Sequence, residues 1–423
     1  MTAGSPSQDA APTVVVLTLS PALDCTLTVP RLDRGRTHRA GPAAEVLGGK
    51  GVNVARVLAA LGVPSVAFGP VAREHWPTAG DAETVRWALT DTPAPLRRSI
   101  AVIEDSGRAT LINETAHPHP AHVWATLRSG VEARLREPGL RVLVISGSTP
   151  DDCPADLVPG LITAAHAAGI TVIVDTSATG LLAAAEAGAD WVKPNDEELR
   201  ELFADDADTE RAKCAAAFER AFSPGTARAG ARLSDTSIAV AAGGDPVLRG
   251  AGRLIAAGAR HVLVSRGADG MDLVDATGPR RRARLARTLH GNPTGAGDAA
   301  VAALAWTLAA REAGIEGSGG DAGAGADAGD DVARESAGDH LGDAEIGVLL
   351  TRAVAVSAAA VLMPQAGQIH QRWRDFGHQV ITEDIPDPAP GTPPAPAPAA
   401  IVSTATAAAP TTTPTPHTDG ARP

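Results

Sequence analysis

Short runs of β-branched residues alternate along this chain with longer runs that are rich in Ala and Leu. The strand-like runs are "TVVVLTL" (13–19), "RVLVISG" (141–147), "ITVIVD" (170–175), "ADWVKP" (189–194) and "HVLVSRG" (261–267). The helix-like runs are "GVNVARVLAALG" (51–62), "PADLVPGLITAAHAAG" (154–169), "TGLLAAAEAG" (179–188) and "DEELRELF" (196–203). This alternation predicts an α/β fold, in which a mainly parallel sheet is covered by helices on both faces. Ligands of such sheets bind outside the carboxyl ends of the strands.

One pair of runs breaks this rhythm. "RRSIAVIED" (97–105) and "RATLINE" (108–114) flank Ser106 and Gly107, and this spacing is typical of a β-hairpin. We expect the hairpin to form a small lid or an interface element.

Low-complexity stretches limit the part of the chain that can build a core. Residues 315–342 are mostly Gly, Ala and Asp, and residues 385–423 are mostly Pro, Thr and Ala. Neither stretch can bury enough apolar surface to offset its ordering entropy, so both are expected to be disordered, as are residues 1–12. The length of 423 residues would allow two or three domains, but residues 13–384 are expected to form one domain with a surface insertion.

Charge and cysteine content exclude several classes of protein. The formal net charge is −12, so neither a nucleic acid nor an anionic membrane is an expected partner. The longest basic cluster, "GPRRRARLAR" (278–287), is typical of a solvated strand edge. Three widely spaced cysteines indicate a reducing compartment and argue against a disulfide framework or a zinc site. The first residues lack a signal-peptide pattern and the Ala-rich run 351–363 is too short to span a membrane, so we expect a cytoplasmic protein.

A glycine-rich turn with one carboxylate precedes a long apolar run in "NPTGAGDAAVAAL" (292–304). Gly295 and Gly297 allow a tight turn, and the free N–H groups at the start of the following helix would bind an anion, above all a phosphate. Asp298 has two interpretations. It could be a capping carboxylate that stabilises the helix by about 0.5–2 kcal/mol, or a base that faces a phosphate held by the loop.

A second glycine-rich turn opens a helix in "LGGKGVNVARVLAALG" (47–62). Its spacing is neither that of a Walker A loop nor G-x-G-x-x-G, which argues against a dinucleotide-binding dehydrogenase. Open backbone at Gly48 and Gly49, together with Lys50 and Asn53, is suited to hydroxyls and a phosphate.

A third polar turn follows a strand in "VKPNDEEL" (192–199). The acidic residues after Asn195 could simply match the positive end of a helix dipole. Alternatively, Asn195 and Glu198 could reach a hydrated Mg²⁺, which prefers carboxylate and water oxygens.

Seven motifs, taken in order, resemble those of the PfkB (ribokinase-like) family of sugar kinases. They are "TLSPALD" (18–24), "GGKGVNVARVLAALG" (48–62), "VISGSTP" (144–150), "IVDTS" (173–177), "VKPNDEEL" (192–199), "VSRGADG" (264–270) and "TGAGD" (294–298). The similarity is greatest to the branch of 1-phosphofructokinases and tagatose-6-phosphate kinases. The resemblance implies a three-layer α/β/α sandwich with a small β-sheet lid, whose strands lie within residues 24–46 and 97–115, and a homodimer formed through that lid.

The resemblance also assigns roles to residues. Asp298 matches the catalytic base, and Gly295, Ala296 and Gly297 match the anion hole that holds the transferring phosphoryl group. The acceptor site would comprise Asp24, Gly48, Gly49, Lys50, Asn53 and the lid arginine Arg97, with Lys50 meeting the substrate phosphate. Arg39 is added to this site for its positive charge. The nucleotide site would comprise Lys193, Asn195, Ser265, Gly267 and Gly270, and Asn195 and Glu198 would organise Mg²⁺.

The implied activity is the ATP- and Mg²⁺-dependent phosphorylation of a ketohexose phosphate, with fructose 1-phosphate going to fructose 1,6-bisphosphate as the first choice. The alternatives are fructose 6-phosphate or tagatose 6-phosphate as acceptor, a nucleoside or unphosphorylated sugar, or a non-catalytic sugar-phosphate sensor. The chain departs from the branch at Ser20 and Ser99, where Asn is frequent, and at Ala101, where Lys is frequent. The missing lysine removes a positive charge near the substrate phosphate, which Arg36, Arg39 or Arg98 could replace, so the sugar phosphate stays open.

Overall fold

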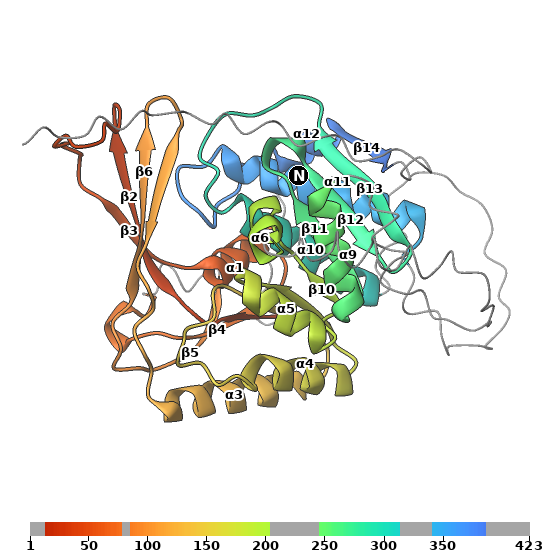
Figure 1. Ribbon diagram of the computed structural model, residues 1–423. Helices are drawn as coiled ribbons and strands as arrows, with labels where there is room; N and C mark the ends of the chain where they lie inside the picture. The colour runs from red at the N-terminus through yellow and green to blue at the C-terminus, as the bar shows by residue number, and fades with distance from the viewer. Residues whose placement is uncertain (1–12, 78–84, 204–244, 314–340, 386–423) are drawn as a thin grey trace, which may run out of the picture. The chain divides into compact units, whose positions relative to one another are not determined.

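The computed structural model describes residues 13–77, 85–203, 245–313 and 341–385 (Figure 1). The stretches expected to be disordered lie outside these described residues except at their ends. Leu341 is buried in the core, Gly342 is the N-cap of helix α11 (Asp343–Val361), and Ile385 packs against the core. These three residues therefore belong to the folded part of the chain, and the expected boundaries are corrected accordingly.

A ten-stranded sheet lies at the centre of the described residues. In spatial order its strands are β14 (Val380–Asp384), β13 (Gly278–Leu285), β12 (Met271–Asp275), β11 (His261–Ser265), β10 (Trp191–Val192), β9 (Thr171–Asp175), β8 (Val142–Ser146), β1 (Val14–Thr18), β4 (Ser65–Pro70) and β5 (Arg86–Thr90). The strands from β11 to β5 pair in parallel, whereas β12, β13 and β14 are antiparallel. The prediction of a mainly parallel sheet is confirmed.

Helices cover both faces of this sheet, because its central strands are apolar on both sides. Along β1, Val15 and Leu17 contact one helical layer, and Val14 and Val16 contact the other. The first layer consists of α3 (Ala121–Leu135), α4 (Leu157–Ala167), α5 (Ala178–Glu186), α6 (Asp196–Leu202) and α9 (Pro246–Ala257). The second consists of α1 (Lys50–Ala60), α10 (Ala296–Glu312) and α11. The three-layer architecture is confirmed.

A separate four-stranded sheet forms the lid beside the main sheet (Figure 1). Its order is β3 (Ala44–Gly48), β2 (Ala22–Val29), β6 (Arg97–Glu104) and β7 (Ala109–Asn113). The central pair β2 and β6 is parallel, and β6 and β7 form the expected hairpin. Residues 30–43, between β2 and β3, contain no strand.

Two expectations about single elements were wrong. The basic strand β13 is not a sheet edge, because β14 pairs with it and Arg282 binds the fully buried Asp272 at 2.6 Å. The Ala-rich run 351–363 was expected to be too short to span a membrane, but it belongs to the longer helix α11, which is the one described helix long and apolar enough to cross a membrane. Its apolar residues, among them Leu349 and Leu350, are buried in the core against α10, which explains the composition without a membrane. The short elements η1 (Arg73–His75), η2 (Gly267–Asp269) and α12 (Trp373–Gly377) complete the described fold.

Candidate active site

A cavity of about 1490 Å³ lies at the carboxyl ends of the parallel strands and is bordered by the lid. Single drug-sized ligands occupy cavities of roughly 300–1,000 Å³, so this cavity has room for two substrates. Most of the residues predicted from the sequence line it: Asp24, Gly49, Lys50, Asn53, Arg97, Lys193, Asn195, Glu198, Ser265, Gly267, Gly270, Gly295, Ala296, Gly297 and Asp298. The fold thus brings together side chains that are up to 274 positions apart, from Asp24 to Asp298.

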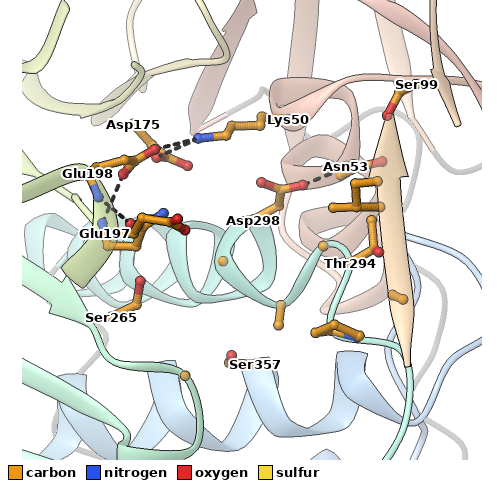
Figure 2. Close-up of a pocket in the computed structure, with 18 of the residues that line it drawn as sticks. Lys50, Asn53, Ser99, Asp175, Glu197, Glu198, Ser265, Thr294, Asp298 and Ser357 are labelled. Carbon is orange, nitrogen blue, oxygen red and sulfur yellow. Dashed lines mark hydrogen bonds and ion pairs between the residues drawn. The ribbon is translucent and has the colours of Figure 1, made fainter. Parts of the chain in front are cut away.

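Asp298 lies in the first turn of α10 and is only 6% exposed. Its Oδ2 accepts a hydrogen bond of 2.9 Å from the side-chain amide of Asn53, which holds the carboxylate toward the cavity (Figure 2). Burial, followed by the negative charge of Asp175, raises the pKa of Asp298 to about 6. The carboxylate is therefore mostly ionised at neutral pH, but by a smaller margin than an exposed aspartate.

The turn before Asp298 exposes the first amides of α10. Gly295 is the N-cap with φ +84°, a left-handed conformation that favours glycine, and α10 begins at Ala296. A Cβ at Gly297 would lie 3.4 Å from the ammonium of Lys193, so the amides and this cation face the same space. Helix N-termini and ammonium groups both attract anions, which makes this corner of the cavity suitable for a phosphoryl group.

Asp175 joins two lysines from different motifs. It is 1% exposed, and its Oδ1 lies 3.3 Å from Lys50 Nζ and 3.7 Å from Lys193 Nζ. Lys50 Nζ also lies 3.7 Å from Glu198 Oε1, and the charge of Asp175 holds the pKa of Lys50 above its ordinary value (Figure 2). The sequence predicted that Lys50 meets the phosphate of the acceptor, but its ammonium is directed toward the carboxylates of Asp175 and Glu198.

Asp24 lines the cavity next to Gly49, the second residue of the Gly48–Gly49 turn. Burial raises its pKa, whereas a hydrogen bond from the Gly49 amide, nearby arginines and Asn53 lower it. Gly48 does not line the cavity itself, but a Cβ there would overlap the carboxylate of Asp24. Gly49 has φ +100°. Gly48 therefore leaves room for the Asp24 carboxylate, and Gly49 donates its amide to it.

The two predicted arginines differ in location. Arg97 lines the cavity from the start of β6, and its Nε donates a hydrogen bond of 2.8 Å to Ser20 Oγ. Arg39 lies in the exposed segment between β2 and β3 and is not among the cavity-lining residues. The sequence therefore placed Arg39 in the acceptor site, but within this chain the fold does not bring it there.

The loops after β10 and β11 line the part of the cavity that the sequence predicts as the nucleotide site. Asn195 and Glu198 form a reciprocal cap of α6: Glu198 N–H donates to Asn195 Oδ1 at 2.7 Å, and Asn195 N–H donates to Glu198 Oε2 at 2.9 Å. Gly270 has φ +92°, and a Cβ there would overlap the carbonyl of Ala283. The interpretation of Asn195 as a helix cap is thus the one that the geometry supports.

Several lining residues were not predicted as site residues. Asp175 is the last residue of the buried strand β9, and this position at the carboxyl end of a parallel strand was the signal that could have identified it. Ser99 and Asn113 come from neighbouring lid strands and are joined by a hydrogen bond of 2.9 Å. Ser357 and its apolar neighbours on α11 carry no local motif, so only the tertiary fold reveals that they face the cavity (Figure 2).

Comparisons with known proteins agree with this geometry. Residues 13–227 and 244–328 match the pfkB family of carbohydrate kinases. The 1-phosphofructokinase of Xanthomonas campestris is 32% identical over 310 residues, which cover 70% of this chain and 83% of that protein. The ATP-dependent 6-phosphofructokinase isozyme 2 of Escherichia coli is 33% identical over 202 residues, which cover 45% of this chain and 62% of that protein.

Solved structures share the fold. The tetrameric inhibited form of phosphofructokinase-2 from Escherichia coli superimposes with a TM-score of 0.62 at 24% identity, covering 87% of this chain and 99% of that one. A structure described as a possible 1-phosphofructokinase from Thermotoga maritima gives a TM-score of 0.61 at 18% identity, covering 88% and 99%. Because the family match extends over more than half of the sequence, the chain belongs to the pfkB family of carbohydrate kinases.

Proposed function

We propose that this carbohydrate kinase transfers the γ-phosphoryl group of ATP to a ketohexose phosphate, with fructose 1-phosphate as the acceptor and fructose 1,6-bisphosphate as the product. The observation that carries the proposal is the buried Asp298 beside the first amides of α10, in a cavity with room for two substrates. The name of the Xanthomonas campestris relative, a 1-phosphofructokinase, supports the choice of acceptor.

Each group in the cavity has a role in this reaction. Asp298 accepts the proton of the acceptor hydroxyl, whose oxygen forms a bond to the γ-phosphorus. The bond from that phosphorus to the bridging oxygen of the β-phosphate breaks, and ADP leaves. The charge of the transition state lies mostly on the equatorial oxygens of the transferring group, so positioning and electrostatics supply most of the catalysis. The amides of Gly295, Ala296 and Gly297, with the ammonium of Lys193, would supply them.

Magnesium fits the acidic groups on the nucleotide side. Asp175 and Glu198 line the cavity, and Asp175 Oδ2 is buried without a hydrogen-bond partner among the described residues. Mg²⁺ in kinase sites is usually held by one or two carboxylates together with water and substrate phosphates. We propose that Asp175 and Glu198 hold it, whereas the Asn195 oxygen is engaged in the helix cap. When bound, Mg²⁺ neutralises phosphate charge.

The pH dependence of the reaction should follow the ionisation of Asp298. A general base acts only when deprotonated, and the pKa of Asp298 is raised to about 6. We therefore expect kcat/KM for the acceptor to be constant above pH 7 and to fall about tenfold per pH unit well below pH 6. Steady-state rates between pH 5 and pH 8 measure this limb.

The substrate phosphate titrates in the same range, so the assignment needs a control variant. The negative charge of Asp175 raises the pKa of Asp298. Removing that charge also frees Lys50 and Lys193 from their ion pairs with Asp175, and both lysines lower the pKa of Asp298. Asp175→Asn also removes a proposed Mg²⁺ ligand, so its rate should fall at every pH. In the activity that remains, the acid limb should move to lower pH. An acid limb at the same pH in both proteins would assign it to the substrate and contradict the role of Asp298.

A panel of acceptors separates this function from its alternatives. ADP release is measured with ATP, Mg²⁺ and each of fructose 1-phosphate, fructose 6-phosphate, tagatose 6-phosphate and fructose. The highest kcat/KM for fructose 1-phosphate is the expected result. A preference for a 6-phosphate would reassign the acceptor, and binding without any turnover would favour a non-catalytic sensor.

We also propose that the protein acts in the cytoplasm as a homodimer formed through the lid. Leu111 and Ile112 on the outer lid strand β7 are 48% and 55% exposed. They point to opposite faces of the strand, and Leu111 lines the cavity, so Ile112 is the apolar side chain of this pair that we propose meets the second lid. Light scattering after size exclusion should give twice the chain mass of 42.8 kDa for the wild type and a lower mass for Ile112→Glu. A wild-type mass of one chain would contradict the dimer.

A further inference from the structure

Two arginines of the lid line the cavity. Arg108 lies at the hairpin turn and is paired with Glu104 at 2.7 Å, whereas Arg97 lies next to Asp24 and Ser20 on the proposed acceptor side. Arg97 begins β6, and on the same face of this strand the positions toward the lid tip hold the neutral residues Ser99 and Ala101. Arg98 points to the other face of the strand and does not line the cavity. If the acceptor carries a phosphate, as the proposed function requires, Arg97 is the lid residue that can pair with it.

Arg97 is fixed by contacts that leave part of its guanidinium available. Its Nε donates to Ser20 Oγ at 2.8 Å, one terminal nitrogen donates to the Ser20 carbonyl at 3.3 Å, and the other lies 3.5 Å from the Glu114 carbonyl. A guanidinium has five N–H groups. Three are directed at these oxygens, so two remain to form the paired contact that guanidinium groups make with phosphate.

Ser20 supplies two of those three oxygens from a rigid position. It is 2% exposed, lies in the connection between β1 and β2, and is followed by Pro21. Its carbonyl is also close to Gly49, because a Cβ on Gly49 would lie 3.2 Å from that oxygen. Ser20 therefore connects the glycine-rich turn that holds Asp24 with the arginine of the lid.

We infer that Ser20 is a positioning residue, which fixes the Arg97 guanidinium for the phosphate of the acceptor and so determines the preference for phosphorylated over unphosphorylated sugars. Serine occupies a position where the related branch often has asparagine. The Ser20 hydroxyl oxygen accepts a hydrogen bond directly from the Nε–H of Arg97. Without this hydrogen bond the Arg97 side chain can adopt more rotamers, and phosphate binding must then restrict it at an entropic cost. The inference rests on the proposed function, since it requires a phosphorylated acceptor.

Calorimetric titration without nucleotide tests the inference independently of turnover. Fructose 1-phosphate and fructose are titrated into the wild type, Ser20→Ala, Arg97→Met and the double variant. We expect Ser20→Ala to bind fructose 1-phosphate about tenfold more weakly, as the loss of one hydrogen bond to a charged group implies. Arg97→Met should lose about a hundredfold, and the double variant should be no weaker than Arg97→Met. Fructose affinity should change less than twofold in Ser20→Ala.

Steady-state kinetics and a matched variant separate positioning from a general structural effect. Ser20→Ala should raise KM for fructose 1-phosphate while kcat and KM for ATP stay unchanged. Ser65→Ala is the control, because Ser65 is also buried but its hydroxyl has no hydrogen-bond partner among the described residues. This variant should change none of the three constants.

Three results would overturn the inference: unchanged affinity in Ser20→Ala, equal losses for fructose and its phosphate, or additive losses in the double variant. Wild-type protein that binds but does not phosphorylate fructose 1-phosphate would refute the proposed function alone. Wild-type protein that does not bind it would refute both.

Discussion

Asp298→Asn is expected to lower kcat by about 10²–10⁴-fold, the contribution of a positioned general base, while the affinities for ATP and acceptor change little. The asparagine has nearly the same size, so the turn at Gly295 and the contact with Asn53 should keep their positions. What disappears is the only group in the reaction scheme that accepts the proton of the attacking hydroxyl. Single-turnover rates and calorimetric titration of both substrates measure the two effects separately.

Thermal unfolding provides the control for this variant. Burial raises the pKa of Asp298 from 3.8 in the unfolded chain to about 6 in the folded state. The stability that this carboxyl contributes is therefore fully present below about pH 4, is lost as pH rises to about 6, and stays lost at higher pH. At pH 8, Asp298→Asn removes this loss, and its melting temperature should equal or exceed that of the wild type. A large loss of kcat with a lowered melting temperature would point to structural damage, and retention of wild-type kcat would refute the base.

Gly295→Ala should lower kcat by about 10²–10³-fold, as the loss of a preorganised anion-hole donor does in other enzymes. Gly295 has φ +84°, and an added Cβ would lie 2.9 Å from Ala366 Cβ and 3.0 Å from its Cα. Something must therefore move, and the first turn of α10 carries both the amides and Asp298. Steady-state kinetics at saturating ATP and acceptor measure the loss.

Gly62→Ala is the matched control for backbone strain. Gly62 has φ +78°, but no atom lies within 4 Å of its added Cβ and it does not line the cavity. Both variants should lose about 1–2 kcal/mol of stability from the left-handed conformation. Only Gly295→Ala should lose activity. An equal loss of kcat in both variants would show that global stability, and not the geometry of the turn, controls turnover.

The fold was predictable because its signals are local. Strands and helices in this chain can be recognised from short runs of consecutive residues. In β1, for example, every side chain is buried on one face of the sheet or the other, so the strand appears in the sequence as an unbroken apolar run. The lid hairpin was predictable from the turn at Ser106 and Gly107 for the same reason. Leu341 was wrongly placed in the insertion because the low-complexity composition around it hides its burial, which depends on the tertiary fold.

The candidate site was predictable as a set of residues but less so in its contacts. The order of the motifs identified Asp298, Asn53 and Lys50 as residues of one site. It did not show which hydrogen bonds and ion pairs their side chains form. Lys50 turns toward Asp175 and Glu198 because two buried or half-buried carboxylates attract its ammonium, and such a choice depends on charges that lie 125 and 148 positions away. Arg39 was assigned from charge alone, and charge does not specify which face of a loop a side chain takes.

The arrangement around Asp298 can be measured most directly in a crystal structure of the wild type with fructose 1-phosphate, Mg²⁺ and a non-hydrolysable ATP analogue. We predict that the attacking hydroxyl lies within about 2.6–3.2 Å of an Asp298 carboxylate oxygen. The γ-phosphate should accept hydrogen bonds from the amides that follow Gly295. A sugar bound with every hydroxyl out of reach of Asp298, or a γ-phosphate held elsewhere in the cavity, would contradict this account.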